Sequence, residues 1–262
     1  MDSNLPQLPI SSETGDALAK PIAESVGNAG KDILEAVFHV ALDGIRRFNM
    51  QRQFNLDKFQ KELEEGTSSI PLENRDDSKL GLVLKAVEDS KYQLDEDDIR
   101  ELFTKLITST LDNRKNDKVL PIFSTIISNM TPSEANLLKS LYLNTLSVTP
   151  YVELKISTKN TGIVRYPRIA MLLLDSSNTY GAELDLSLLE SANLIKHDTD
   201  SSLNAPRFIQ RYETGEKLLS QIIEQNQDHP VLALQENEIV NFDRSLYRLT
   251  PIGKSFCEVI FE

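Results

Sequence analysis

The spacing of apolar residues changes near residue 147, and this change constrains the fold more than any other feature of the chain. Before it, apolar side chains return every three or four positions, which predicts amphipathic helices. After it, β-branched and aromatic residues gather in short runs such as 148–157, which predicts strands among helices. We therefore expect a mainly α (α+β) protein with a loose leader over 1–15, a helical domain over 16–146, and a winged-helix-like module with a small antiparallel sheet over 147–262.

Capping signals mark where three of the helices begin. Asp95 stands before an acidic first turn, as an N-cap residue does. Thr131 and Glu134 have the spacing of a capping box, with proline at the first helical position. Thr250 precedes a second such proline. These residues predict helix starts directly after Asp95, Thr131 and Thr250.

The C-terminal half carries the pattern of a winged helix. A short helix over 186–194 leads into a strand at Ile195. Two further strands are expected at 238–242 and 246–250, joined by a short turn over 243–245. In a winged helix, the strand that follows the short helix pairs with a second strand, whose sequence is similar to that of 246–250. We expect this hairpin to lie over the helix.

The charge of the chain argues against a protein that coats nucleic acid. Forty acidic and 28 basic residues give a net charge of −12, whereas phosphate binding needs clustered Lys and Arg. The stretch 154–174 differs, because it holds basic residues and a tyrosine but no acid. A nucleic-acid-binding surface would use Lys155, Lys159, Arg165, Tyr166, Arg168 and Arg211. The alternative is a solvated pair of strands.

A different surface is predicted on the helix over 31–48, which is apolar on more than one face. Such a helix is either buried on two sides or used to bind a protein partner, another copy of the chain, or a membrane surface. The residues expected to bind there are Val37, Phe38, Leu42 and Ile45.

Several features suggest a cytoplasmic protein. The longest uncharged apolar run of the helix, 36–42, is much shorter than the about 20 residues that span a bilayer. The N-terminus lacks the basic start of a signal peptide. The one cysteine, Cys257, suits a reducing compartment. We expect no transmembrane segment, with peripheral membrane contact left open.

The sequence contains no recognisable catalytic or metal-binding constellation. The three histidines lie far apart, and the acidic run 95–98 lacks the glycine of an EF-hand loop. Glu153 and Lys155 have the Glu-x-Lys spacing of some metal-dependent nucleases, a hypothesis that requires another acid within a few ångströms of Glu153. We expect no enzymatic activity, no cofactor and no metal.

Several helix and strand sequences resemble the bacterial abortive infection alpha (Abi-alpha) family. Residues 97–111 are similar to its Leu-Arg-Glu helix, and 120–135 to its next helix and Leu-Thr-Pro junction. Residues 188–195 and 247–256 resemble two later stretches, although Ala192-Asn193 stands where the family often has Leu-Gly. The resemblance implies a cytoplasmic bacterial protein linked to phage exclusion, and it transfers no functional residues.

These observations lead to one expected function and one alternative. We expect a non-enzymatic protein-interaction component of a bacterial phage-response (abortive infection) or stress system. The alternative is a winged-helix regulator that binds nucleic acid.

Overall fold

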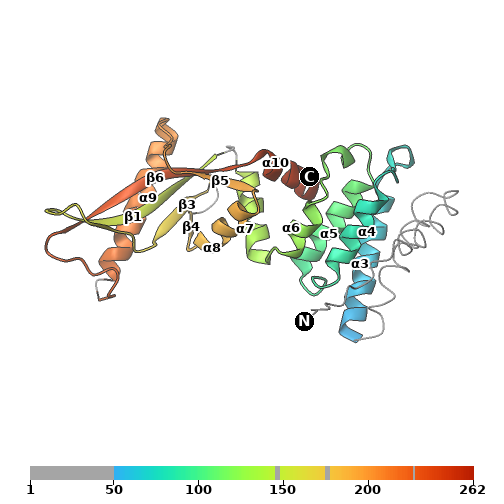
Figure 1. Cartoon of the computed structure of the whole chain (residues 1–262), viewed down its shortest axis with the longest axis horizontal. Helices are drawn as coiled ribbons and strands as arrows, with labels where there is room; N and C mark the ends of the chain where they lie inside the picture. The colour runs from blue at the N-terminus through green and yellow to red at the C-terminus, as the bar shows by residue number, and fades with distance from the viewer. Residues whose placement is uncertain (1–49, 145–147, 175–177, 227) are drawn as a thin grey trace, which may run out of the picture. The chain divides into compact units, whose positions relative to one another are not determined.

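The protein forms two compact units that divide between Asn129 and Met130 (Figure 1). The computed structural model describes residues 50–144, 148–174, 178–226 and 228–262. The predicted leader over 1–15 and the predicted partner-binding helix over 31–48 lie outside these residues, as do Val37, Phe38, Leu42 and Ile45. Over the described ranges, no helix has the length and apolar character that crossing a membrane requires.

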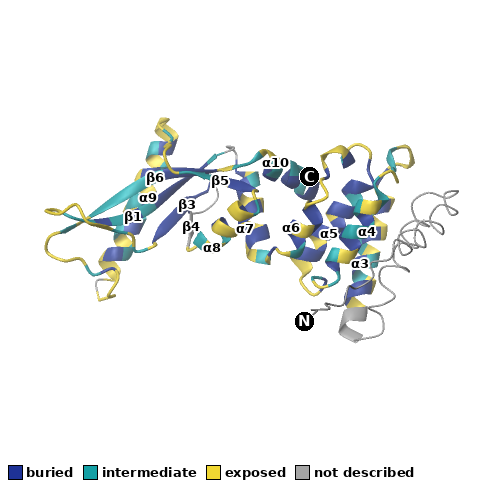
Figure 2. Cartoon of the chain, in the orientation of Figure 1, coloured by how far each residue is buried: buried dark blue, intermediate teal, exposed yellow. Residues whose placement is uncertain are grey.

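The first unit is helical. Its α-helices are α3 (Met50–Ser68), α4 (Leu80–Ser90), α5 (Asp97–Thr110) and α6 (Phe123–Ser128), and short 3-10 turns lie at Leu72–Asn74 and Asn116–Lys118. Helix α5 packs against all three of the others, and buried residues run along the helices (Figure 2). Phe59 of α3, Phe103 of α5 and Phe123 of α6 are fully buried.

The start of α5 differs by one residue from the prediction. Glu96, not Asp95, occupies the N-cap position, and its side chain makes no capping hydrogen bond. Asp95 instead accepts a hydrogen bond from Asn55 Nδ2 of α3 at 2.6 Å. The acid that was expected to cap the helix therefore connects α5 to its neighbour, while Asp97 and Asp98 supply negative charge in the first turn.

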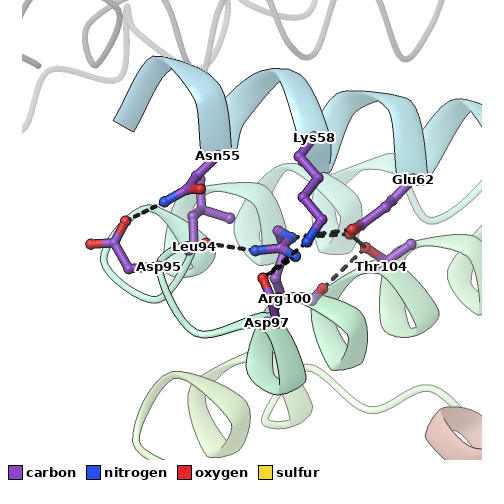
Figure 3. A network of polar contacts seen from close by, with 8 residues as sticks. All are labelled: Asn55, Lys58, Glu62, Leu94, Asp95, Asp97, Arg100 and Thr104. Atoms are coloured by element: carbon purple, nitrogen blue, oxygen red, sulfur yellow. Dashed lines mark hydrogen bonds and ion pairs between the residues drawn. The ribbon is translucent and has the colours of Figure 1, made fainter. Parts of the chain in front are cut away.

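A buried arginine joins α5 to α3 (Figure 3). The Arg100 side chain is 2% exposed, and its guanidinium lies 3.2 Å from Glu62 Oε2 and 2.5 Å from Asp97 Oδ1. It also donates to the carbonyl of Leu94 at 2.9 Å. Burial on its own would lower the pKa of Arg100, but the hydrogen bonds and charges of Asp97 and Glu62 raise it. The guanidinium is thus charged and bonded to residues of three segments.

The second unit combines helices with an antiparallel sheet. Its strands are β1 (Val148–Thr158), β2 (Val164–Arg165), β3 (Ala170–Leu173), β4 (Asn178–Tyr180), β5 (Ile195–Asp198) and β6 (Glu238–Leu249). Its helices are α7 (Pro132–Leu143), α8 (Glu183–Ser191), α9 (Pro206–Gln225) and α10 (Pro251–Phe261). The strand order is β4-β3-β1-β6-β5, and β2 pairs with the C-terminal end of β1. The predicted mainly α, α+β class is confirmed.

Helix α9 covers one face of this sheet. Alternate residues of β1 (Val152, Leu154 and Ile156) form a core with Tyr212 and Leu219 of α9. Side chains on a strand point alternately to opposite faces. The residues between them on β1 therefore point away from α9.

Two predicted features of the second unit can be compared directly with the structure. The predicted pairing of the strand at Ile195 is confirmed, because Ile195 lies opposite Leu249 in an antiparallel register. The predicted turn over 243–245 is wrong, because these residues lie inside the continuous strand β6. Bonding to β1 along the whole of this segment keeps it extended. The winged-helix assignment itself stays a prediction.

The division between the units falls earlier than the predicted boundary at residue 146. Helix α7 begins with the predicted capping box of Thr131 and Glu134, but it packs against α8 and α10 of the second unit. Its helical periodicity could not reveal this, because periodicity shows which face is buried but not which partner buries it.

The junction between β6 and α10 depends on a glycine. Thr250 caps α10 as predicted, accepting from the Gly253 N–H at 2.9 Å. The backbone N–H of Thr250 donates to the carbonyl of Leu194 at 3.0 Å. A Cβ atom at Gly253 would lie 1.8 Å from that carbonyl oxygen. The stretch 247–256 therefore needs glycine here because the helix lies directly against the backbone before β5.

Replacing Arg100 with alanine is expected to lower the free energy of unfolding by about 2–5 kcal/mol, because a large buried side chain is lost together with its ion pairs. Arg100→Met keeps most of the volume and should lose less. The control is Lys61→Ala, which removes an exposed pair with Glu65 at 3.8 Å and should change stability by less than about 1 kcal/mol. Urea unfolding followed by circular dichroism measures all three. Equal losses in R100A and K61A would contradict a central role for Arg100.

Replacing Gly253 with alanine is expected to destabilise the protein by about 1–3 kcal/mol, because the new methyl group would overlap a backbone oxygen. Gly81 in α4 provides the matched control, since a Cβ built there meets no described atom within 4 Å apart from its own chain neighbours and the backbone of its helix. Gly81→Ala should stabilise by about 0.5–1 kcal/mol through its helix propensity. Thermal unfolding of both variants tests this, and a G253A variant at least as stable as the wild type would contradict the role of the contact with Leu194.

Candidate functional site

The sheet face that points away from α9 carries the candidate site. Glu153 and Asp243 lie directly opposite each other on β1 and β6. Lys155 follows on β1, and Tyr166 lies just after β2. We call these four residues the acidic face. Their side chains are half-buried or exposed, and Tyr166 is 50% exposed.

Asp243 is the centre of the polar contacts on this face. Lys155 Nζ forms an ion pair with one of its carboxylate oxygens. The Tyr166 hydroxyl donates to the other at 3.2 Å, and this bond to the carboxylate is the main reason that the pKa of Tyr166 is raised. Asp243 therefore accepts from residues that precede it in the sequence by 88 and 77 positions.

Among the residues that the structure describes, no cation pairs with Glu153. Burial raises the pKa of its carboxyl, and the charges of Asp243 and of Glu183 on α8 raise it further. Like charges directly opposite each other on neighbouring strands destabilise a sheet. The charge of the Glu153 carboxylate would therefore be stabilised by a cation that the described residues do not supply.

An aromatic cluster continues the same face toward α8. The ring of His197 stacks on Tyr247 with 4.3 Å between centroids, and Tyr151 meets both rings edge-on. His197 Nε2 lies 2.8 Å from Ser245 Oγ. Burial lowers the pKa of His197, opposed by the charges of Glu190 and Asp198. A lowered pKa favours neutral imidazole, so we interpret His197 as a packing residue between Tyr247 and Ser245.

The structure brings some of the six predicted nucleic-acid-binding residues together. Lys155 and Tyr166 both contact Asp243. Arg165 lies at the far end of β1 and pairs with Glu238, 2.9 Å from Oε2. That hydrogen bond, with one from the Gln235 backbone, lowers the pKa of Glu238 to about 2. Both cations on these strands are thus bonded to acids from β6.

The other three predicted residues lie elsewhere. Arg211 belongs to α9, which packs on the opposite face of the sheet. Lys159 is exposed just after β1. Arg168 is exposed before β3 and has a left-handed backbone, with φ of 58°. The structure therefore does not gather the six residues around one position, and their role in nucleic-acid binding stays a prediction.

The nuclease hypothesis required an acid beside Glu153, and Asp243 meets that condition through the register of β1 and β6. However, Lys155, which would position water, instead bonds to Asp243. Among the residues that the structure describes, no three His, Cys, Asp or Glu side chains are placed to hold a metal ion together. The site therefore consists of two carboxylates and a lysine that is already paired with one of them.

Sequence reasoning missed Asp243 and His197, which are central to this face. The sequence pattern predicts a turn at Asp243, although Val240, Phe242 and Leu246 alternate with polar residues as in a strand. That alternation could have placed Asp243 on a polar face. Nothing local marks His197, whose contact with Ser245 spans 48 residues.

Comparison with known proteins agrees with the resemblance seen in the sequence. The profile of the family described as abortive infection alpha matches residues 51–260. The chain therefore belongs to the abortive infection alpha family. This membership suggests a role related to abortive infection.

Other comparisons add little to the family match. No curated protein matches the chain. A solved structure of an uncharacterised protein from the hydrocarbon-degrading marine bacterium Alcanivorax borkumensis SK2 is 16% identical, with a TM-score of 0.29. The alignment covers 57% of this chain and 96% of that one.

Replacing Glu153 with glutamine is expected to stabilise the protein at pH 7 by about 0.2–1 kcal/mol, because it removes a charge opposite Asp243. A raised folded-state pKa means that the wild type loses stability as the pH rises from the ordinary value of 4.5. The gain from E153Q should therefore be largest at neutral pH and vanish below about pH 4.5. The control is Glu101→Gln, at an exposed position on α5. Urea unfolding at several pH values tests this, and a gain that does not depend on pH would contradict it.

Proposed function

We propose that the chain is a non-enzymatic protein-interaction component of a bacterial phage-response (abortive infection) or stress system, and that the acidic face binds its protein partner. The observation that carries this proposal is the pair of opposed carboxylates, Glu153 and Asp243, on a face that α9 leaves uncovered. Binding a protein partner requires a charged surface such as this one, whereas it does not require catalytic side chains.

The charges on this face favour a protein over nucleic acid. Glu153 and Asp243 would repel phosphate, and Lys155 is already paired with Asp243. Arg165 of β2 is likewise paired with Glu238, at the start of β6. Nucleic-acid binding would require these ion pairs to break before a phosphate could be bound.

The chemistry of the face suggests what the partner presents. A Lys or Arg side chain near Glu153 would offset the repulsion from Asp243. The exposed ring of Tyr166 offers apolar area with a polar tip, as tyrosines do at protein interfaces. A partner with a basic segment beside an apolar side chain would therefore fit. The helix over 31–48 stays predicted as a further interaction surface.

Photo-crosslinking in phage-infected cells tests the proposal directly. A benzophenone amino acid replaces Tyr166 in the full chain, and the matched control places it at Tyr92, which is 82% exposed in the first unit. We expect position 166 to form a discrete protein adduct that position 92 does not form. Adding Glu153→Lys should remove that adduct, because it replaces the carboxylate with a cation.

The same variants distinguish the alternatives. A crosslink from position 166 to nucleic acid would support the regulator and contradict the proposal. Equal labelling from positions 166 and 92 would also contradict it. In a plaque assay, E153K should weaken any protection by the chain, whereas Glu101→Lys should leave it unchanged.

A further inference from the structure

Strand β6 has a long edge that no described strand covers. On one side, β1 pairs with it from Glu238 to Arg248. On the other side, β5 pairs only with Leu246–Leu249. The segment Glu238–Ser245, on the side away from β1, is called the open edge below.

Backbone hydrogen bonds of β1 fix which residues of β6 direct their N–H and C=O groups toward the open edge. Leu154 N–H and Thr158 N–H both donate away from β6, to Ile169 and Ile163. The odd-numbered residues of β1 therefore bond to β6, where the register places odd-numbered residues opposite them. It follows that Val240 and Phe242 direct their N–H and C=O groups outward, as does Arg244.

The C-terminal end of β6 confirms that its even-numbered residues direct their backbone groups away from β1. Thr250, which is also even-numbered, donates its N–H to Leu194 just before β5. His197 of β5, whose register partner is odd-numbered, turns its N–H away from β6 to Glu190. Within the described part of the chain, no backbone hydrogen bond occupies the outward groups of Val240, Phe242 and Arg244. Such an edge is a template for another strand.

We propose that the open edge pairs with the open edge of a second copy of this chain, so that two antiparallel sheets join across a two-fold axis at Asn241. This inference does not rest on the proposed function. It concerns the backbone edge of β6, whereas the proposed partner binds side chains on the acidic face.

The length of the open edge selects this register. Centring the pair on Asn241 places Glu238 opposite Arg244 of the second copy and uses the edge almost completely. Moving the centre to Phe242 would place Glu238 opposite Leu246, which β5 already pairs. Moving it to Val240 would pair fewer residues. In this register, even-numbered residues of one copy lie opposite even-numbered residues of the other. The outward N–H and C=O groups of both strands therefore face each other.

The side chains in this register complement each other. Val240 lies opposite Phe242 of the second copy, and both are half-buried residues that pack beside the core under α9. Glu238 lies opposite Arg244 of the second copy, which joins an acid to a base. Arg244 already pairs with Glu216 at 2.6 Å, and Glu238 with Arg165. Pairing would link these ion pairs into alternating networks of charge.

A proline substitution tests the proposal with little disturbance of the sheet. Val240→Pro removes an N–H that points to the open edge but none that bonds to β1, and proline is tolerated at such edge positions. We expect the full wild-type chain to have the mass of two chains by light scattering at micromolar concentration. V240P should have the mass of one, and Val240→Thr, which keeps the N–H, should remain a dimer.

A cysteine substitution tests the register without relying on V240P to fold. Asn241→Cys would place two thiols opposite each other at the axis, in a non-hydrogen-bonded pair with Cα atoms about 4.5 Å apart, close enough for a disulfide. Native Cys257 is buried. Mild oxidation should crosslink N241C into dimers, whereas Ser157→Cys on the adjacent β1 should remain uncrosslinked.

Three results would overturn the proposal. They are a wild-type chain that is monomeric throughout the micromolar range, a V240P variant that stays a folded dimer, and N241C that crosslinks no faster than S157C. A monomer that instead gains a bound extended peptide at this edge would assign the edge to a different partner.

Discussion

The pairing of β1 with β6 is the interaction on which the second unit depends. It joins segments about 90 positions apart along the full length of β1. One side of the joined strands supplies the core under α9. The other side sets Glu153 opposite Asp243, and the uncovered part of β6 forms the open edge. Because these features share one register, a slip by one residue would turn the core residues outward and the acids inward.

In the first unit, Arg100 has a comparable role in holding segments together. It lies within the stretch 97–111 that resembles the abortive infection alpha family, yet its contacts are with Glu62, Asp97 and the Leu94 carbonyl. Gly253 lies in another such stretch and acts through close packing. These motif residues therefore stabilise the fold. The acidic face lies outside the stretches that carry the resemblance, so the family's motifs do not include the proposed binding surface.

The stretch 154–174 illustrates how a one-dimensional charge pattern can mislead. It contains no acid, and so it indicated a surface for phosphate. In the sheet, β6 lies beside it and supplies Asp243 to Lys155 and Glu238 to Arg165. The local charge of a strand depends on its neighbours across the sheet, and these neighbours are set by long-range pairing. The positive stretch of sequence thus becomes part of a mixed surface with an acidic centre.

The sequence by itself determined the local structure: the helix starts at Thr131 and Thr250, the strand over 148–157, and the α+β class. Capping and side-chain periodicity act within a few residues, so they can be recognised without knowing the fold. Tertiary structure decided the rest. It extended β6 through residues 243–245, placed α7 with the sheet and brought Asp243 to Glu153. Each of these outcomes depends on which distant segment buries a face or completes a hydrogen-bonded edge, and local spacing does not encode that choice.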